Sequence, residues 1–152
     1  MRTVVPIATL LVFSFSIATA CASSPDATPP DQGSIDALEA KVLQAEPRDQ
    51  CFLYAQLVQQ MTELSIRQYA AGDYDTATSL LKRVQRIAQK IHLSMSDNDK
   101  RLKNTEILLR HTAFRLNEML HASSIEDRPL VEQTLAQVTQ AQNATMMQVF
   151  HK

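Results

Sequence analysis

The segment from Arg67 to Val84 constrains the fold more than any other part of this 152-residue chain. Gly72 separates two stretches whose apolar residues recur at helical spacing, and Asp73 and Asp75 follow it closely. Glycine readily takes the left-handed conformation in which many helices end. Either aspartate can then accept hydrogen bonds from the first N–H groups of a new helix. The segment therefore predicts two helices that pack as an antiparallel hairpin.

The rest of the chain also has a helical composition. It contains only two glycines and no tryptophan, and no run alternates apolar and polar residues as a half-buried strand would. We expect helices over 35–45 and 47–71, a third that begins near 75, a fourth that begins after residues 96–99, and a last one that Pro129 opens. Short loops favour antiparallel neighbours. The prediction is an all-α domain over 34–152, built from two successive helical hairpins as a four-helix bundle.

Candidate core residues follow from the helical spacing of the apolar positions. The third helix has the most regular stripe, with Ala77, Leu80, Leu81, Val84, Ile87, Ala88 and Ile91. For the last two helices the candidates are Leu102, Thr105, Leu109, Ala113, Leu116, Met119, Leu120, Val131, Leu135, Val138, Ala141, Thr145 and Val149. Cys51 is expected to be a small buried helix residue, and an intermolecular disulfide is the alternative.

The predicted turn resembles that of a tetratricopeptide repeat. Leu64 and Ser65, then Gly72-Asp73-Tyr74, then Ala77 stand where that family places its leucine, small residue, turn and second small residue. The resemblance implies closely packed helices, with Tyr74 filling the space between them. It makes a small domain similar to tetratricopeptide repeats the alternative to a four-helix bundle. It covers about 30 residues, Val84 replaces a second expected alanine, and the second hairpin has no equivalent turn. A single repeat does not form the peptide groove of the family.

The N-terminus has the layout of a secretory signal over residues 1–20. Arg2 precedes an uncharged run, and the small residues Ala18-Thr19-Ala20 lead to Cys21. One interpretation is a bacterial lipobox, in which Cys21 carries the lipid; Ala18 stands where lipoboxes favour leucine. Ordinary cleavage after Ala20 would instead give a soluble secreted protein. A retained anchor helix is the third alternative, although the apolar run is short and contains Pro6.

Residues 21–33 are rich in proline, serine and alanine and lack core-forming side chains, which is typical of a flexible tether. A tether of this kind suits a domain whose N-terminal end is held at a membrane. The expected localisation is therefore the bacterial envelope, with the domain anchored at the periplasmic side or outer membrane, or else secreted.

Charge is distributed unevenly, although the whole chain carries a formal charge of only −1. Residues 26–75 hold nine acids and three bases, and residues 76–152 hold eleven bases and seven acids. Lys82, Arg86 and Lys90 are four residues apart and share one helix face, with Arg83 beside them. We call these four residues the basic stripe. It predicts a contact for an anionic partner, or else a face turned toward the acidic first helices. The near-neutral total argues against nucleic-acid binding.

No motif indicates catalysis or a metal site. The chain has no GxSxG, phosphate loop or CxxC, and its four histidines show no HExxH spacing. The sequence therefore predicts a non-enzymatic interaction or scaffold module, with no cofactor and with a protein or an envelope polymer as partner. The alternative is a soluble periplasmic protein that binds a metal or another small ligand.

Overall fold

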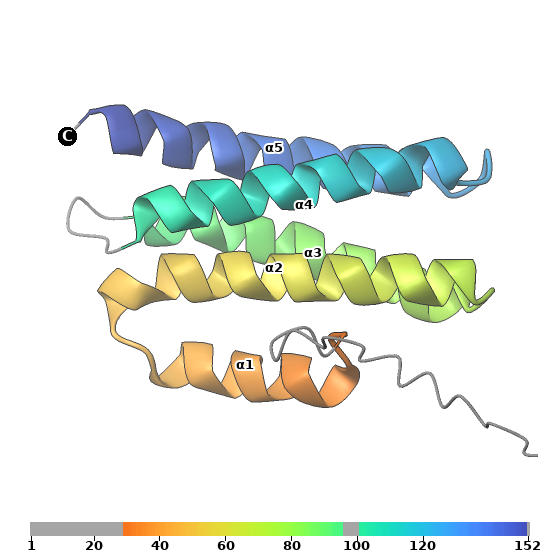
Figure 1. Cartoon of the computed structure of the whole chain (residues 1–152), viewed down its shortest axis with the longest axis horizontal. Coiled ribbons are helices and arrows are strands. Elements are labelled where there is room, and N and C mark those ends of the chain that lie inside the picture. The colour runs from red at the N-terminus through yellow and green to blue at the C-terminus, as the bar shows by residue number, and fades with distance from the viewer. Residues whose placement is uncertain (1–28, 96–100, 152) are drawn as a thin grey trace, which may run out of the picture.

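The computed structural model describes residues 29–95 and 101–151. These residues form five helices and no strand (Figure 1): α1 (Gln32–Gln44), α2 (Pro47–Ala70), α3 (Tyr74–Ser94), α4 (Leu102–Ala122) and α5 (Arg128–Phe150). The predicted all-α class is confirmed. None of the described helices is long and apolar enough to span a membrane.

The first hairpin forms at the predicted turn. Gly72 has a φ of 84°, which is the left-handed region that its lack of a Cβ permits. Asp73 is the cap of α3, because its carboxylate accepts a hydrogen bond from the Thr76 N–H. The hydroxyl of Ser65 donates to the carbonyl of Ala77 at 2.9 Å, and both residues are fully buried. Small side chains therefore let α2 and α3 approach closely at this end.

Tyr74 does not fill the space between α2 and α3, contrary to what the family resemblance implies. It is 52% exposed and lies edge-on to Tyr69, with ring centroids 4.9 Å apart. Tyr69 instead links the two hairpin turns. Its hydroxyl accepts a hydrogen bond from the Ser124 N–H and donates one to Asp127.

The two hairpins stack side by side in the same orientation. In Figure 1, α4 lies beside α2 and α5 beside α3, while α1 lies on the opposite side of α2. Side chains that bond between the hairpins are about one hairpin apart in sequence. Gln85 bonds Thr134, 49 residues later, and Glu63 bonds Arg115, 52 residues later. The second hairpin thus has the same orientation as the first and is displaced from it along the stack.

The short helix α1 begins earlier than predicted. Asp31 is its cap, and Asp31 and Ser34 exchange the reciprocal hydrogen bonds of a capping box. Ser34, which precedes the predicted helix over 35–45, is therefore already inside the helix, and the last two residues of the predicted tether, Gln32 and Gly33, belong to α1. Ile35 and Val42 are buried and hold α1 against the hairpin.

The core lies between the four long helices and matches most of the predicted positions. The seven apolar residues of α3 that the spacing predicted as core, from Ala77 to Ile91, are all buried. Cys51 of α2 is buried as well. Thr112 and Thr134 are also buried, although the apolar pattern missed them. Each hydroxyl donates to the backbone carbonyl four residues earlier, which satisfies it inside the helix. Ala113, Leu120, Leu135 and Val149 are only partly buried at the edge of the core.

Candidate functional site

The basic stripe lies on α3 beside α1. Lys82, Arg86 and Lys90 are exposed, as their four-residue spacing on one face predicts, and Arg83 is half-buried. A cleft of about 390 Å³ separates α1 from this part of α3. Arg83, Arg86 and Lys90 line it, so the structure brings three of the four stripe residues to one cleft.

The floor of this α1–α3 cleft is apolar. Val42 of α1, Leu57 of α2 and Ile87 of α3 line it and are 3%, 2% and 8% exposed. Leu43 stands at the rim and is 84% exposed. The cleft therefore offers an apolar surface bordered by cations, which is the pattern that binds groups with both an apolar and an anionic part.

Arg83 is engaged within the chain. Its guanidinium donates to the Glu39 carboxylate of α1 at 2.6 Å, and this pair bridges the two sides of the cleft. The side chains are 25% and 40% exposed, so the pair lies at the protein–water boundary. One member of the stripe therefore faces an acid of the first helices and holds α1 in place.

The other stripe cations are available to solvent. Among the described residues, neither Lys82 nor Arg86 has a carboxylate within ion-pair distance. The ammonium of Lys90 lies 5.9 Å from the ring centre of Tyr54, close enough for a cation–π contact with this α2 side chain. Such a contact orients the ammonium but leaves its charge without a counter-ion.

The basic residues at the start of α4 do not line the α1–α3 cleft. Arg101 stacks over Phe52 of α2, with 5.0 Å between the guanidinium carbon and the ring centre. It borders a separate cleft with Lys41, Glu46 and Asp49. Lys103 is exposed, and Lys100 lies outside the described residues. The α1–α3 cleft therefore involves the stripe of α3 and not these cations.

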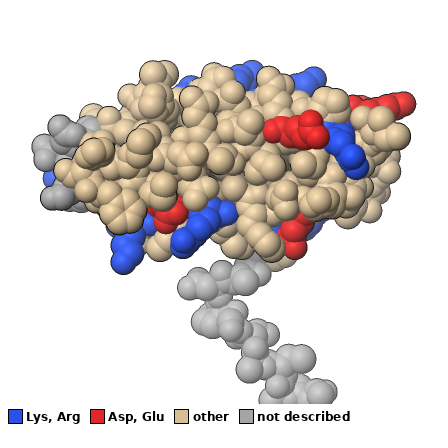
Figure 2. All heavy atoms as spheres, turned by 90° about the horizontal axis from the view of Figure 1, so that it is seen from above, with Lys and Arg blue, Asp and Glu red and all other residues tan. Residues whose placement is uncertain are grey.

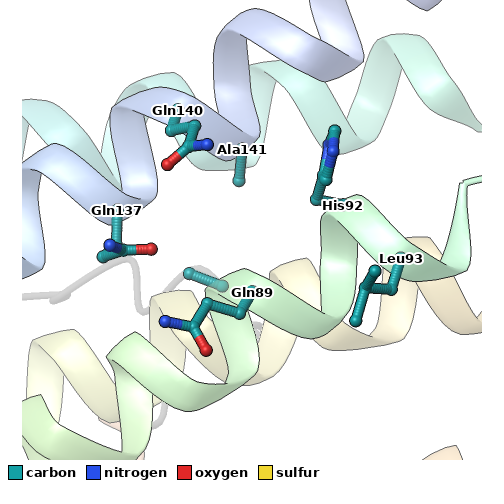
Figure 3. Close-up of a pocket in the computed structure, with 7 residues that line it drawn as sticks. Gln89, His92, Leu93, Gln137, Gln140 and Ala141 are labelled. Atoms are coloured by element: carbon teal, nitrogen blue, oxygen red, sulfur yellow. The ribbon is translucent and has the colours of Figure 1, made fainter.

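A second, uncharged groove lies between α3 and α5. Figure 3 shows Gln89 and His92 of α3 across from Gln137 and Gln140 of α5, with Ala141 between them. The hollow has a volume of about 310 Å³. Its lining is carboxamide, imidazole and apolar groups, and it contains neither paired carboxylates nor an activated nucleophile. No motif in the sequence predicts this groove.

The histidines do not converge. His92 of α3, His111 and His121 of α4, and His151 just after α5 are all exposed. In the described part of the chain, no three His, Cys, Asp or Glu residues are placed to hold one metal ion. Cys21, the predicted lipid-attachment residue, lies outside the described residues.

No family model, curated protein or solved structure matches this chain.

Proposed function

We propose that this chain is a non-enzymatic interaction module of the bacterial cell envelope, anchored by a lipid on Cys21. Its α1–α3 cleft would bind an acidic, amphipathic segment of a partner protein. The proposal rests on one observation above all, which is that Arg86 and Lys90 border an apolar cleft and have no carboxylate partner among the described residues.

The chemistry of the cleft favours a protein segment as its occupant. An envelope polymer could pair with Arg86 and Lys90, but it would gain little from the apolar floor of Val42, Leu57 and Ile87. A helix or extended peptide that presents leucines beside glutamates matches both features, and burying its apolar side chains contributes about 25 cal/mol per Å². Charge complementarity then fixes its orientation and raises the association rate.

The anchored location is supported by the N-terminal sequence. Residues 1–20 resemble an export signal, Cys21 stands at the lipobox position, and the Pro/Ser-rich tether separates it from α1. The first described residues lead directly into α1, which forms one wall of the cleft. Anchoring would therefore hold the cleft within a tether length of the membrane, where envelope partners are concentrated.

A defined peptide tests the cleft. The probe is a fluorescent 16-residue amphipathic helix with glutamate on one face and leucine on the other, compared with a version in which glutamine replaces glutamate. The protein should bind the glutamate peptide at least about 10-fold more tightly, a difference of about 1.4 kcal/mol. Reversing Lys82, Arg86 and Lys90 to Glu should abolish that preference.

The matched control reverses three cations away from the cleft, Lys103, Arg110 and Arg128, to Glu. This variant has the same net charge as the stripe variant and should keep the preference. If both triple variants lose it equally, bulk charge alone attracts the peptide and the cleft is not the site. Circular dichroism melts of both variants establish that each is folded.

The anchor is tested separately by metabolic labelling with a fatty-acid analogue in a bacterial host. The wild-type chain should incorporate the label and Cys21→Ala should not. An unlabelled wild-type chain would rule out the lipoprotein and leave ordinary export after Ala20 or a retained anchor helix.

A further inference from the structure

The α1–α3 cleft contains an acid of its own. Among the described residues that line it, Glu39 is the only acidic one. Its carboxylate accepts a hydrogen bond from Nη2 of Arg83 at 2.6 Å, so it already occupies the position that a partner's carboxylate would take on this cation. Arg86 and Lys90, the other cations of the cleft, have no carboxylate partner in the part of the chain that the structure describes.

The Arg83–Glu39 pair is of the kind that a competing carboxylate can displace. One guanidinium nitrogen contacts one carboxylate oxygen, and within the described residues neither Nε nor Nη1 of Arg83 donates a hydrogen bond. Both side chains reach solvent, and ion pairs at such positions contribute little to stability. The guanidinium of Arg115 differs, because it binds both oxygens of Glu63.

The position of α1 does not depend on this pair alone. Ile35 and Val42 are buried, and Leu38 packs against the core at its edge. The helix can therefore keep its place when Glu39 rotates away from Arg83 into water. Opening the pair exposes a third cation in the cleft without unfolding any element.

Charged side chains are sparse on the side of the stack away from α1. Figure 2 shows the molecule from the α4–α5 side, where most of the surface carries neither acidic nor basic side chains and the charged ones lie mainly near the edges. The combination of unpaired cations, an apolar floor and an internal acid belongs to the α1–α3 cleft.

We propose that Glu39 is an internal competitor for the carboxylates of the partner, and that the partner displaces it from Arg83 on binding. This inference rests on the proposed binding of an acidic amphipathic segment in the cleft. Arg83, Arg86 and Lys90 follow one another at intervals of three and four residues, so the preferred partner presents three acids at one-turn intervals of a helix. Because the pair must open first, the apparent affinity is lower than the intrinsic affinity of the cleft by the fraction of molecules in which Arg83 is free.

Glu39→Gln tests the competition with the glutamate and glutamine peptides that probe the cleft. It should lower the dissociation constant of the glutamate peptide about 3-fold and leave that of the glutamine peptide unchanged, since an exposed ion pair competes with about that strength. Asp36→Asn is the matched control, because it removes one negative charge from the same helix at a residue that does not line the cleft. It should change the dissociation constant by less than about 1.5-fold, because solvent and salt screen charges outside the contact. Circular dichroism melts establish that both variants are folded.

Arginine side-chain NMR reports the exchange of partners directly. The Nε–Hε signal of Arg83 is assigned by its loss in Arg83→Lys. In the wild-type protein this signal should shift when the glutamate peptide is added and stay in place when the glutamine peptide is added.

The other results separate this inference from the proposed function. Equal affinities of the wild type and Glu39→Gln for the glutamate peptide would overturn the competition and leave binding in the cleft intact. An equal gain from Asp36→Asn would also overturn it, because net charge alone would then explain the gain. An Arg83 signal that is unchanged at saturating glutamate peptide would mean that Glu39 keeps its place. If neither the wild type nor Glu39→Gln prefers the glutamate peptide, the proposed function is wrong and the competition is wrong with it.

Discussion

Arg115 of α4 donates hydrogen bonds from Nε and Nη2 to the two carboxylate oxygens of Glu63 on α2, at 2.9 and 3.2 Å. The same guanidinium also pairs with Glu118 of its own helix. The hydrogen bond to Glu63, followed by that to Glu118, raises the pKa of Arg115 above its ordinary value. The two acids are not equivalent, because only Glu63 connects the first hairpin to the second.

Replacing Glu63 should therefore weaken the stack more than replacing Glu118. Glu63→Gln keeps the size of the side chain but removes the charge-assisted bidentate contact, and should lower the free energy of unfolding by about 1–2 kcal/mol. Glu118 is 46% exposed, so Glu118→Gln should cost about 0.5 kcal/mol or less. Urea denaturation of the two variants measures the difference; equal losses would mean that the bridge does not hold the hairpins together.

Tyr69 should stabilise the stack at its other end. Tyr69→Phe removes the hydroxyl that joins the Ser124 N–H to Asp127, and should lower the free energy of unfolding by about 1 kcal/mol. Tyr74→Phe is the matched control, because Tyr74 contributes a ring contact with Tyr69 and its surface is half exposed. Thermal melts that show the larger loss for Tyr74→Phe would contradict the linking role of Tyr69.

The sequence predicted individual helices well because each carries its own local signals. Gly72 and Asp73 set the first turn, and the apolar spacing from Ala77 to Ile91 identifies the buried face of α3 without reference to any other segment. Thr112 and Thr134 were missed for a physical reason. A threonine can be buried when its hydroxyl bonds to its own helix, and a pattern of apolar residues does not contain that information.

The arrangement of the hairpins and the identity of the cleft were less predictable. The basic stripe was evident from Lys82, Arg86 and Lys90, but the sequence did not indicate which acid Arg83 would meet. Its partner Glu39 lies 44 residues away, and their meeting depends on where α1 docks. Likewise, no local signal places Gln85 against Thr134, because that contact follows from the stacking of two hairpins.

Replacement by alanine should destabilise the protein at Gly72 but not at Gly33. A Cβ at residue 72 would meet nothing within 4 Å, so the cost of Gly72→Ala is the left-handed backbone alone, about 1 kcal/mol. Gly33 lies inside α1, and its added Cβ would approach Asp31 at an ordinary 3.7 Å. Gly33→Ala should therefore leave stability unchanged or raise it by up to about 1 kcal/mol. Destabilisation by Gly33→Ala of the size seen at Gly72 would contradict this assignment.

Ala77 lies in the contact between α2 and α3. Its side chain is fully buried, and its carbonyl accepts the hydrogen bond from Ser65 of α2, so a longer side chain would enter the packed contact between the helices. Ala77→Glu would place a carboxylate there without a partner. Burial of an unpaired charge and overpacking together should cost more than about 4 kcal/mol, enough to abolish the cooperative melt of a small domain.

Ser79→Glu is the control for Ala77→Glu, because residue 79 is exposed on the same helix two positions later. It adds the same charge to the same element and should change the free energy of unfolding by no more than about 0.5 kcal/mol. Circular dichroism during heating compares the two variants. A cooperative transition of Ala77→Glu at the temperature of the Ser79→Glu transition would mean that residue 77 does not lie between the helices, and the hairpin packing described for α2 and α3 would be wrong.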